Sequence, residues 1–178
     1  MKQQDYIRYV HHILAPEGFL FELIQEKHTP YILKWRNNPR YQDYFISFQN
    51  ITEEGQKAFL KEYHRKDRLD FVLSVTVPSL PIGVFSLKNI SIEPEVGQFI
   101  GDDTFQGRGL GKAATLALLR FSFETLDLPR LYARVNQMNI RNLHLLKKIG
   151  FIFLKEEKYN QRSFDVLILD NKKHKKIE

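Results

Sequence analysis

The sequence predicts one α+β (α/β) domain, with a mixed central sheet of six to seven strands flanked by about four helices. The chain has 178 residues, the usual size of a single domain, and 43% of them are hydrophobic, which is enough for a core. Runs rich in Val, Ile, Leu and Phe alternate with segments that carry helix caps. Because the sequence has no internal repeat or low-complexity linker, residues 1–178 are expected to form one domain.

The N-terminal part is predicted to contain one strand and then two helices. Residues 19–24 form an apolar run typical of a strand. Thr29 is a suitable N-cap, and Pro30 suits the first turn of a helix that runs to about Arg36. A second helix is expected to start at Thr52, since two glutamates follow it at the positive end of the helix.

The middle of the chain is predicted to form an antiparallel meander. Residues 71–77 and 82–90 are strand-like, and the turn sequence Pro78-Ser79-Leu80-Pro81 separates them. A third strand is expected over 95–100. The glycine-bearing segment 101–111 then leads into a largely apolar helix, so strand, glycine loop and helix follow one another.

The C-terminal third is predicted to complete the sheet. Gly150 marks the end of one helix as a C′ residue. The helices expected from the glycine loop onward cover 112–126 and 140–149, and the strands cover 131–135, 151–154 and 164–169.

Composition limits the classes of function. The chain lacks cysteine, which excludes disulfides, thiolate metal sites and a cysteine nucleophile. The first twelve residues lack the apolar run of a signal peptide or membrane helix, so a cytoplasmic protein without membrane contact is expected. The net charge of +6 is compatible with nucleic acid, ribosomes, acidic proteins or a polyanionic cofactor as a partner, and charge alone does not choose among them. The basic tail, about 171–178, is interpreted as a solvated terminus, and no function is assigned to it.

The glycine loop carries the clearest chemical signal. A helix N-terminus presents unpaired backbone N–H groups and binds phosphate when the preceding loop lets the backbone approach the ligand. Gly107, Gly109 and Gly111 permit this approach, and Arg108 and Lys112 add positive charge. The predicted ligand is a pyrophosphate, and the alternative is an ordinary glycine turn. The spacing fits neither a Walker loop nor a dinucleotide fingerprint.

Three segments resemble the GNAT acetyltransferase superfamily. Gln106-x-x-Gly109-x-Gly111 is similar to its Arg/Gln-x-x-Gly-x-Gly/Ala signature, which binds the pyrophosphate of acetyl-CoA. Residues 136–151, which end in Lys148-Ile149-Gly150-Phe151, resemble its second acetyl-CoA segment. Trp35-Arg36-Asn37-Asn38-Pro39 resembles the RimJ/RimL-like branch, and also acetyltransferases of nucleotide-linked amino sugars. The resemblance covers residues 19–169 and implies a GNAT-like sheet with acetyl-CoA as cosubstrate.

The resemblance also implies site residues. Trp35 and Arg36 are predicted to bind substrate, although a core tryptophan at a helix end is the alternative. Asn139 is interpreted as a helix cap. The residues predicted to bind the cofactor are Phe99, Ile100, Gln106, Gly107, Arg108, Gly109, Leu110, Gly111, Lys112, Asn136 and Asn142.

The implied reaction is direct attack of an amine on the thioester, without a metal or a covalent intermediate. Backbone groups of Phe99 and Ile100 are expected to polarise the carbonyl. Glu95 is predicted to be the catalytic base, directly or through water; the alternative is a carboxylate that orders the strand edge or attracts substrate. Many family members place a tyrosine where this chain has Leu146, so the general acid is water or a tyrosine such as Tyr159.

The predicted function is therefore N-acetylation of a primary amine, with a peptide or protein N-terminus as the first substrate class. The alternative is an amino sugar linked to a nucleotide, or another small-molecule amine. A non-catalytic acetyl-CoA-binding protein and a nucleic-acid-binding protein are less favoured, because the loop is intact and the basic residues are scattered. No metal site and no specific nucleic-acid partner are predicted, and the protein is expected to be a monomer or homodimer. Acceptor recognition is assigned to loops at 35–52 and 155–162.

Overall fold

A seven-stranded mixed sheet forms the centre of the computed structural model, which describes residues 3–47 and 49–174. Neighbouring strands are antiparallel except for one pair, β4 and β5, which are parallel. The predicted mixed sheet of six to seven strands is confirmed. In spatial order the strands are β1 (Phe19–Leu23), β2 (Arg68–Val75), β3 (Leu80–Lys88), β4 (Glu95–Ile100), β5 (Arg130–Asn136), β7 (Arg162–Asp170) and β6 (Ile152–Tyr159).

Four helices of the described residues have eight or more residues, as expected. They are α2 (Thr29–Arg36), α4 (Glu53–Lys61), α5 (Leu110–Arg120) and α6 (Ile140–Ile149). Short helical turns occupy much of the remaining connections. These turns are α1 (Gln3–Tyr6), η1 (Ile7–His12), η2 (Glu26–His28), α3 (Pro39–Gln42), η3 (Tyr63–Arg65), η4 (Asp103–Phe105), η5 (Phe121–Thr125) and α7 (Asn171–His174).

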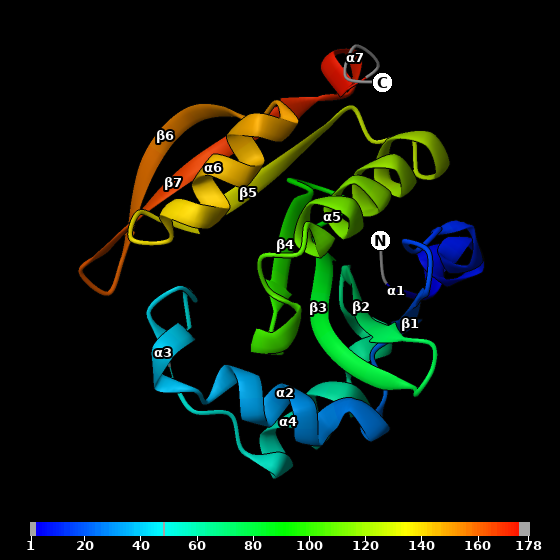
Figure 1. Ribbon diagram of the computed structural model, residues 1–178. Helices are drawn as coiled ribbons and strands as arrows, with labels where there is room; N and C mark the ends of the chain where they lie inside the picture. The colour runs from blue at the N-terminus through cyan, green and yellow to red at the C-terminus, as the bar shows by residue number, and fades with distance from the viewer. Residues whose placement is uncertain (1–2, 48, 175–178) are drawn as a thin grey trace.

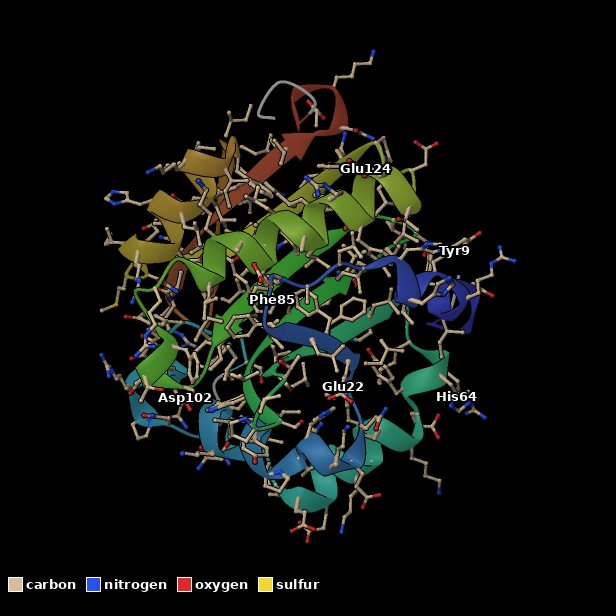
Figure 2. All side chains as sticks on the ribbon, turned by 45° about the vertical axis from the view of Figure 1, so that its right-hand side comes forward. Tyr9, Glu22, His64, Phe85, Asp102 and Glu124 are labelled. Carbon is tan, nitrogen blue, oxygen red and sulfur yellow. The ribbon has the colours of Figure 1, made fainter. Side chains whose placement is uncertain are left out.

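The helices cover the two faces of the sheet, as Figure 1 shows for α5 and α6 above and α2 and α4 below. The main core lies under α5 and α6, where Phe85, Leu118 and Leu146 are at most 1% exposed. A smaller core on the opposite face packs Val72 against Ile32 and its neighbours. Figure 2 shows α5 running across the sheet. Burying both faces in this way follows from the alternation of side chains along each strand.

Local capping rules account for several element ends. Thr52 accepts a hydrogen bond from Gly55 N at 3.0 Å and begins α4. Asn139 caps α6 by accepting from Asn142 N at 3.2 Å, and Gly150, with φ +111°, closes it. The prediction that Thr29 is an N-cap is wrong. Thr29 is the first residue of α2, because the turn η2 precedes it and supplies the cap position at His28.

Other predicted boundaries shift by a few residues. The helix expected over 112–126 begins at Leu110 and ends at Arg120, and the π-helical turn η5 follows it. Residues 155–159, expected in a loop, belong to β6. This edge strand is largely exposed and carries charged side chains, so it lacks the hydrophobic alternation from which strands are predicted. The tail begins with α7, and its residues 175–178 lie outside the described residues.

Candidate active site

Strands β4 and β5 diverge at the centre of the sheet. They are paired only at Glu95 and Tyr132, next to a hydrogen bond from Tyr132 N to Pro94 O of 2.8 Å. Beyond this point the β5-facing backbone of 97–100 has no ladder partner among the described strands. The two strands separate visibly in Figure 1, with α5 beside β4 and α6 beside β5. Pro94 O bonds to β5 and Gly101 N bonds to Ile82 of β3, so by the alternation along a strand the backbone groups of Ile100 face the opening and those of Phe99 face β3. The Ile100 N–H is therefore placed to bind a ligand, and the predicted backbone contact from Phe99 is wrong because this residue pairs with Val84.

The glycine loop presents the N-terminus of α5 at the open end of β4. Gly107 and Gly109 both have φ +80°, a conformation that L side chains rarely adopt. The first helical hydrogen bond is Ala113 N to Gly109 O at 3.1 Å, so the preceding amides point out of the helix. A Cβ at Gly109 would meet no atom within 4 Å. These exposed amides in open space fit a pyrophosphate group. Figure 2 labels Asp102 near this end of α5 and Glu124 at the other end.

Gln106, the first residue of the signature, links the glycine loop to neighbouring segments through side-chain hydrogen bonds. Its Nε2 donates to Ile100 O at 2.9 Å and to Tyr41 Oη at 3.0 Å. Its Oε1 faces Arg141 of α6, whose Nη1 lies 3.5 Å away. The side chain thus connects the end of β4 to the loop, and a positioning role describes these contacts better than the expected contact with the cofactor.

A second polar link crosses from α5 to α6 beneath the diverging strands. Gln98 of β4 accepts a hydrogen bond from Thr115 of α5 and donates one to Asn142 of α6. Asn142 is half-buried at this place. The structure therefore brings Asn142 beside β4, where the sequence predicted cofactor contact, and adds Gln98 and Thr115, whose participation no motif indicated.

The opposite face of β4 carries Glu95 within an ionic network. Its Oε1 lies 2.7 Å from Lys88 Nζ and its Oε2 lies 2.8 Å from Arg134 Nη1. Arg134 also binds Glu93 at 2.5 Å and Glu157 at 2.8 Å. Both oxygens of Glu95 are thus occupied by cations, and only 8% of its side chain is exposed. This arrangement fits the alternative role, a carboxylate that orders the strand edge, better than the role of base.

Trp35 supports the start of the glycine loop. The side chain is 4% exposed, and its ring packs against Tyr31 with a centroid distance of 5.9 Å. A Cβ built on Gly101 would lie 2.2 Å from the indole ring, so the ring rests directly on the backbone there. The interpretation of Trp35 as a substrate-binding residue is therefore replaced by the alternative, a core tryptophan, because the ring is enclosed by protein.

Arg36 packs on the Phe45 ring and has no carboxylate partner in the described part of the chain. Its guanidinium carbon is 3.8 Å from the centroid of the Phe45 ring, and Nη2 donates to Ser47 O at 3.0 Å. The Nε atom is buried and has no hydrogen-bond partner. Burial, together with the positive charge of Arg68, lowers the pKa of Arg36 to about 10. An unneutralised, partly buried cation at this place favours an anionic ligand.

The segment after α3 is attached to the ends of β5 and β7. Asn136 is 2% exposed; its Nδ2 donates to Asp43 O at 2.8 Å, and its Oδ1 accepts from Met138 N at 2.9 Å. Arg162 lies 3.5 Å from Asp43 Oδ1 and 3.4 Å from Ile46 O. Asn136, expected to bind the cofactor, therefore holds this segment beside the diverging strands. From the sequence, Arg162 was assigned only to a recognition loop. Its contacts with Asp43 and Ile46 could not be predicted, because these residues lie far from it in the chain.

Neither position considered for the general acid lies between the diverging strands. Leu146 is 1% exposed in the main core. Tyr159 is on the edge strand β6, where its hydroxyl donates to Glu157 and its ring packs on Phe164 at 5.5 Å. The hydrogen bond to Glu157 raises the pKa of Tyr159. The Tyr159 hydroxyl is connected to Glu95 of β4 through Glu157 and Arg134.

Within residues 3–47 and 49–174, no three His, Asp or Glu side chains gather as a group that could hold a metal ion. No helix in the same ranges is long and apolar enough to cross a membrane.

Comparisons with known proteins agree with this geometry. In structure, the chain resembles a spermidine N-acetyltransferase of Vibrio cholerae in complex with CoA and spermine, with a TM-score of 0.81 and 19% identity over 89% of this chain and 99% of that one. A domain from Methanocaldococcus jannaschii has a TM-score of 0.75 and 19% identity over 85% of this chain and 97% of that one. These similarities concern the fold.

Sequence comparisons add a relative and a family. The chain is 22% identical over 139 residues to an uncharacterised protein of Methanocaldococcus jannaschii, which covers 76% of this chain but only 28% of that protein. The chain thus spans little more than a quarter of this curated relative. Residues 19–152 match the family described as acetyltransferase (GNAT) domain. Since this match covers well over half of the 178 residues, the chain belongs to the GNAT family of acetyl-CoA-dependent acetyltransferases.

Proposed function

We propose that this chain transfers an acetyl group from acetyl-CoA to the primary amine of a small molecule that carries an anionic group. An amino sugar linked to a nucleotide is the first class to test. The observation that carries the proposal is Arg36, a partly buried cation with an unpartnered Nε and no carboxylate partner among the described residues. A phosphate or carboxylate of the acceptor would neutralise it.

The charges around the acceptor side support an anionic acceptor over a polyamine. The carboxylates there are already bound to cations: Asp43 to Arg162, Asp103 to Arg40, and Glu95 to Lys88 and Arg134. A polyamine would have to displace these arginines and lysines. The spermine in the Vibrio cholerae enzyme therefore supports amine acetylation in general. In this chain, however, the three carboxylates are already paired with cations, which favours an acceptor other than a polyamine.

A peptide N-terminus, the first substrate class predicted from the sequence, ranks behind the small molecule. Asn136 and Arg162 hold the segment 43–46 beside the ends of β5 and β7, which restricts the space for a polypeptide. The RimJ/RimL-like branch stays part of the proposal, since the Trp35 to Pro39 segment is common to that branch and to the amino-sugar enzymes.

In the proposed reaction the amine nitrogen forms a bond to the carbonyl carbon while the C–S bond breaks. The amide N–H groups of the α5 N-terminus hold the pyrophosphate, and the backbone N–H of Ile100 in β4 donates to the carbonyl oxygen. The amine releases one proton to water, and the leaving thiolate takes one from water. Glu95 keeps β4 and β5 in register at the point where they separate.

Steady-state release of free CoA thiol tests the proposal with three acceptors: a nucleotide-linked amino sugar, a peptide and spermidine. We expect the highest kcat/KM for the amino sugar. Arg36→Ala should raise the KM for the amino sugar about tenfold or more and leave the KM for acetyl-CoA unchanged. Lys34→Ala, an exposed position on the same helix, is the control. A higher kcat/KM for the peptide or spermidine, or an Arg36→Ala enzyme with unchanged KM, would refute the anionic acceptor.

A further inference from the structure

We propose that Arg141 is a further binding residue for acetyl-CoA, and that it contacts the pyrophosphate from the α6 side. This inference rests on acetyl-CoA as the cosubstrate. Arg141 lies within the second acetyl-CoA segment, residues 136–151, but it is not one of the residues that the sequence predicted to bind the cofactor. The pyrophosphate would then be held by α5 amides on one side and by a guanidinium on the other.

The geometry places Arg141 over the glycine loop. A Cβ built on Gly107 would lie 3.5 Å from Arg141 Nη2, and no other group comes within 4 Å of that position. Arg141 Nη1 lies 3.5 Å from Gln106 Oε1. The guanidinium thus spans the gap between the first turn of α6 and the loop that precedes α5. Gln106 is itself fixed to Ile100 O, so it orients Arg141 relative to the end of β4.

The charge of Arg141 is available for a ligand. The side chain is exposed, and no carboxylate pairs with it in the described ranges. Arg108, the arginine of the signature itself, lies over the Phe105 ring with its guanidinium carbon 5.5 Å from the centroid. The nearby cation that faces Gly107 is therefore Arg141. A planar guanidinium can bind two phosphate oxygens at once, which a lysine ammonium does not do.

Titration of three ligands into the purified protein tests this assignment. The ligands are CoA, 3′-dephospho-CoA and S-acetylpantetheine, which lacks the pyrophosphate. The variants are Arg141→Ala and Arg141→Lys, with Lys61→Ala as a control that removes one exposed charge from α4, outside the site. We expect Arg141→Ala to raise the Kd for CoA about tenfold, and Arg141→Lys to raise it less. The same ratios should hold for 3′-dephospho-CoA, and S-acetylpantetheine should bind all variants equally.

Three results would overturn the assignment. Arg141→Ala with the same CoA affinity as Lys61→Ala would remove Arg141 from the site. A loss that disappears with 3′-dephospho-CoA would place the guanidinium at the 3′-phosphate. An equal loss for S-acetylpantetheine would show a general effect on the fold. Failure of the wild type to bind CoA at all would instead contradict the cosubstrate, so the two failures are distinguishable.

Discussion

Replacing Gly109 by alanine and by glutamate separates the backbone requirement of the phosphate loop from its ligand. Gly109 has φ +80°, and a left-handed conformation costs a residue with a Cβ about 1 to 2 kcal/mol. No atom lies within 4 Å of the position of the added Cβ, so no steric clash adds to this cost. Both variants should therefore lose about 1 to 2 kcal/mol of unfolding free energy in urea titrations.

The two variants should differ in CoA affinity. The glutamate carboxylate would lie beside the pyrophosphate, and two unit charges about 4 Å apart repel by about 1 to 4 kcal/mol when the effective dielectric constant lies between 80 and 20. This energy corresponds to a Kd about five to a thousand times higher for Gly109→Glu than for Gly109→Ala.

Calorimetric titration with CoA measures this ratio directly, with S-acetylpantetheine as the control ligand without the pyrophosphate. Equal CoA affinities for the two variants, at equal stability, would mean that the phosphates bind elsewhere. The amides of α5 would then belong to an ordinary glycine turn.

Two further predictions concern stability. Hydrogen bonds from Arg134, Lys155 and Tyr159 lower the pKa of Glu157 from 4.5 to about 2. A depressed folded-state pKa stabilises the protein above the unfolded pKa. The contribution of Glu157 to the unfolding free energy should therefore be complete above about pH 4.5 and vanish as the pH falls through about 2. A Glu157→Gln variant whose unfolding free energy has the same pH dependence as that of the wild type would contradict this prediction. Gly101→Ala should cost about 1 to 3 kcal/mol of unfolding free energy, because its Cβ would lie 2.2 Å from the Trp35 ring; an unchanged urea midpoint would show that the indole can move.

Features that depend on a few neighbouring residues could be predicted from the sequence. The strand Glu95–Ile100 and the helix Ile140–Ile149 occur with the predicted bounds. Apolar periodicity, Asn139 as N-cap and Gly150 as C′ residue all act within one or two turns, so a single sequence contains them. The glycine loop is local in the same sense, because positive φ at Gly109 and the free amides of α5 follow from the loop and the helix themselves.

Contacts between distant segments were decided only by the tertiary structure. Arg134 and Glu95 are 39 residues apart, and Asn136 and Asp43 are 93 apart. Their pairing depends on the strand order, in which β5 lies beside β4 and β7 inserts between β5 and β6. Glu95 was therefore predicted as a base although two cations occupy its oxygens, and Trp35 as a substrate residue although it rests on Gly101. Backbone geometry is encoded locally, whereas the partner of a buried charge is set by the fold as a whole.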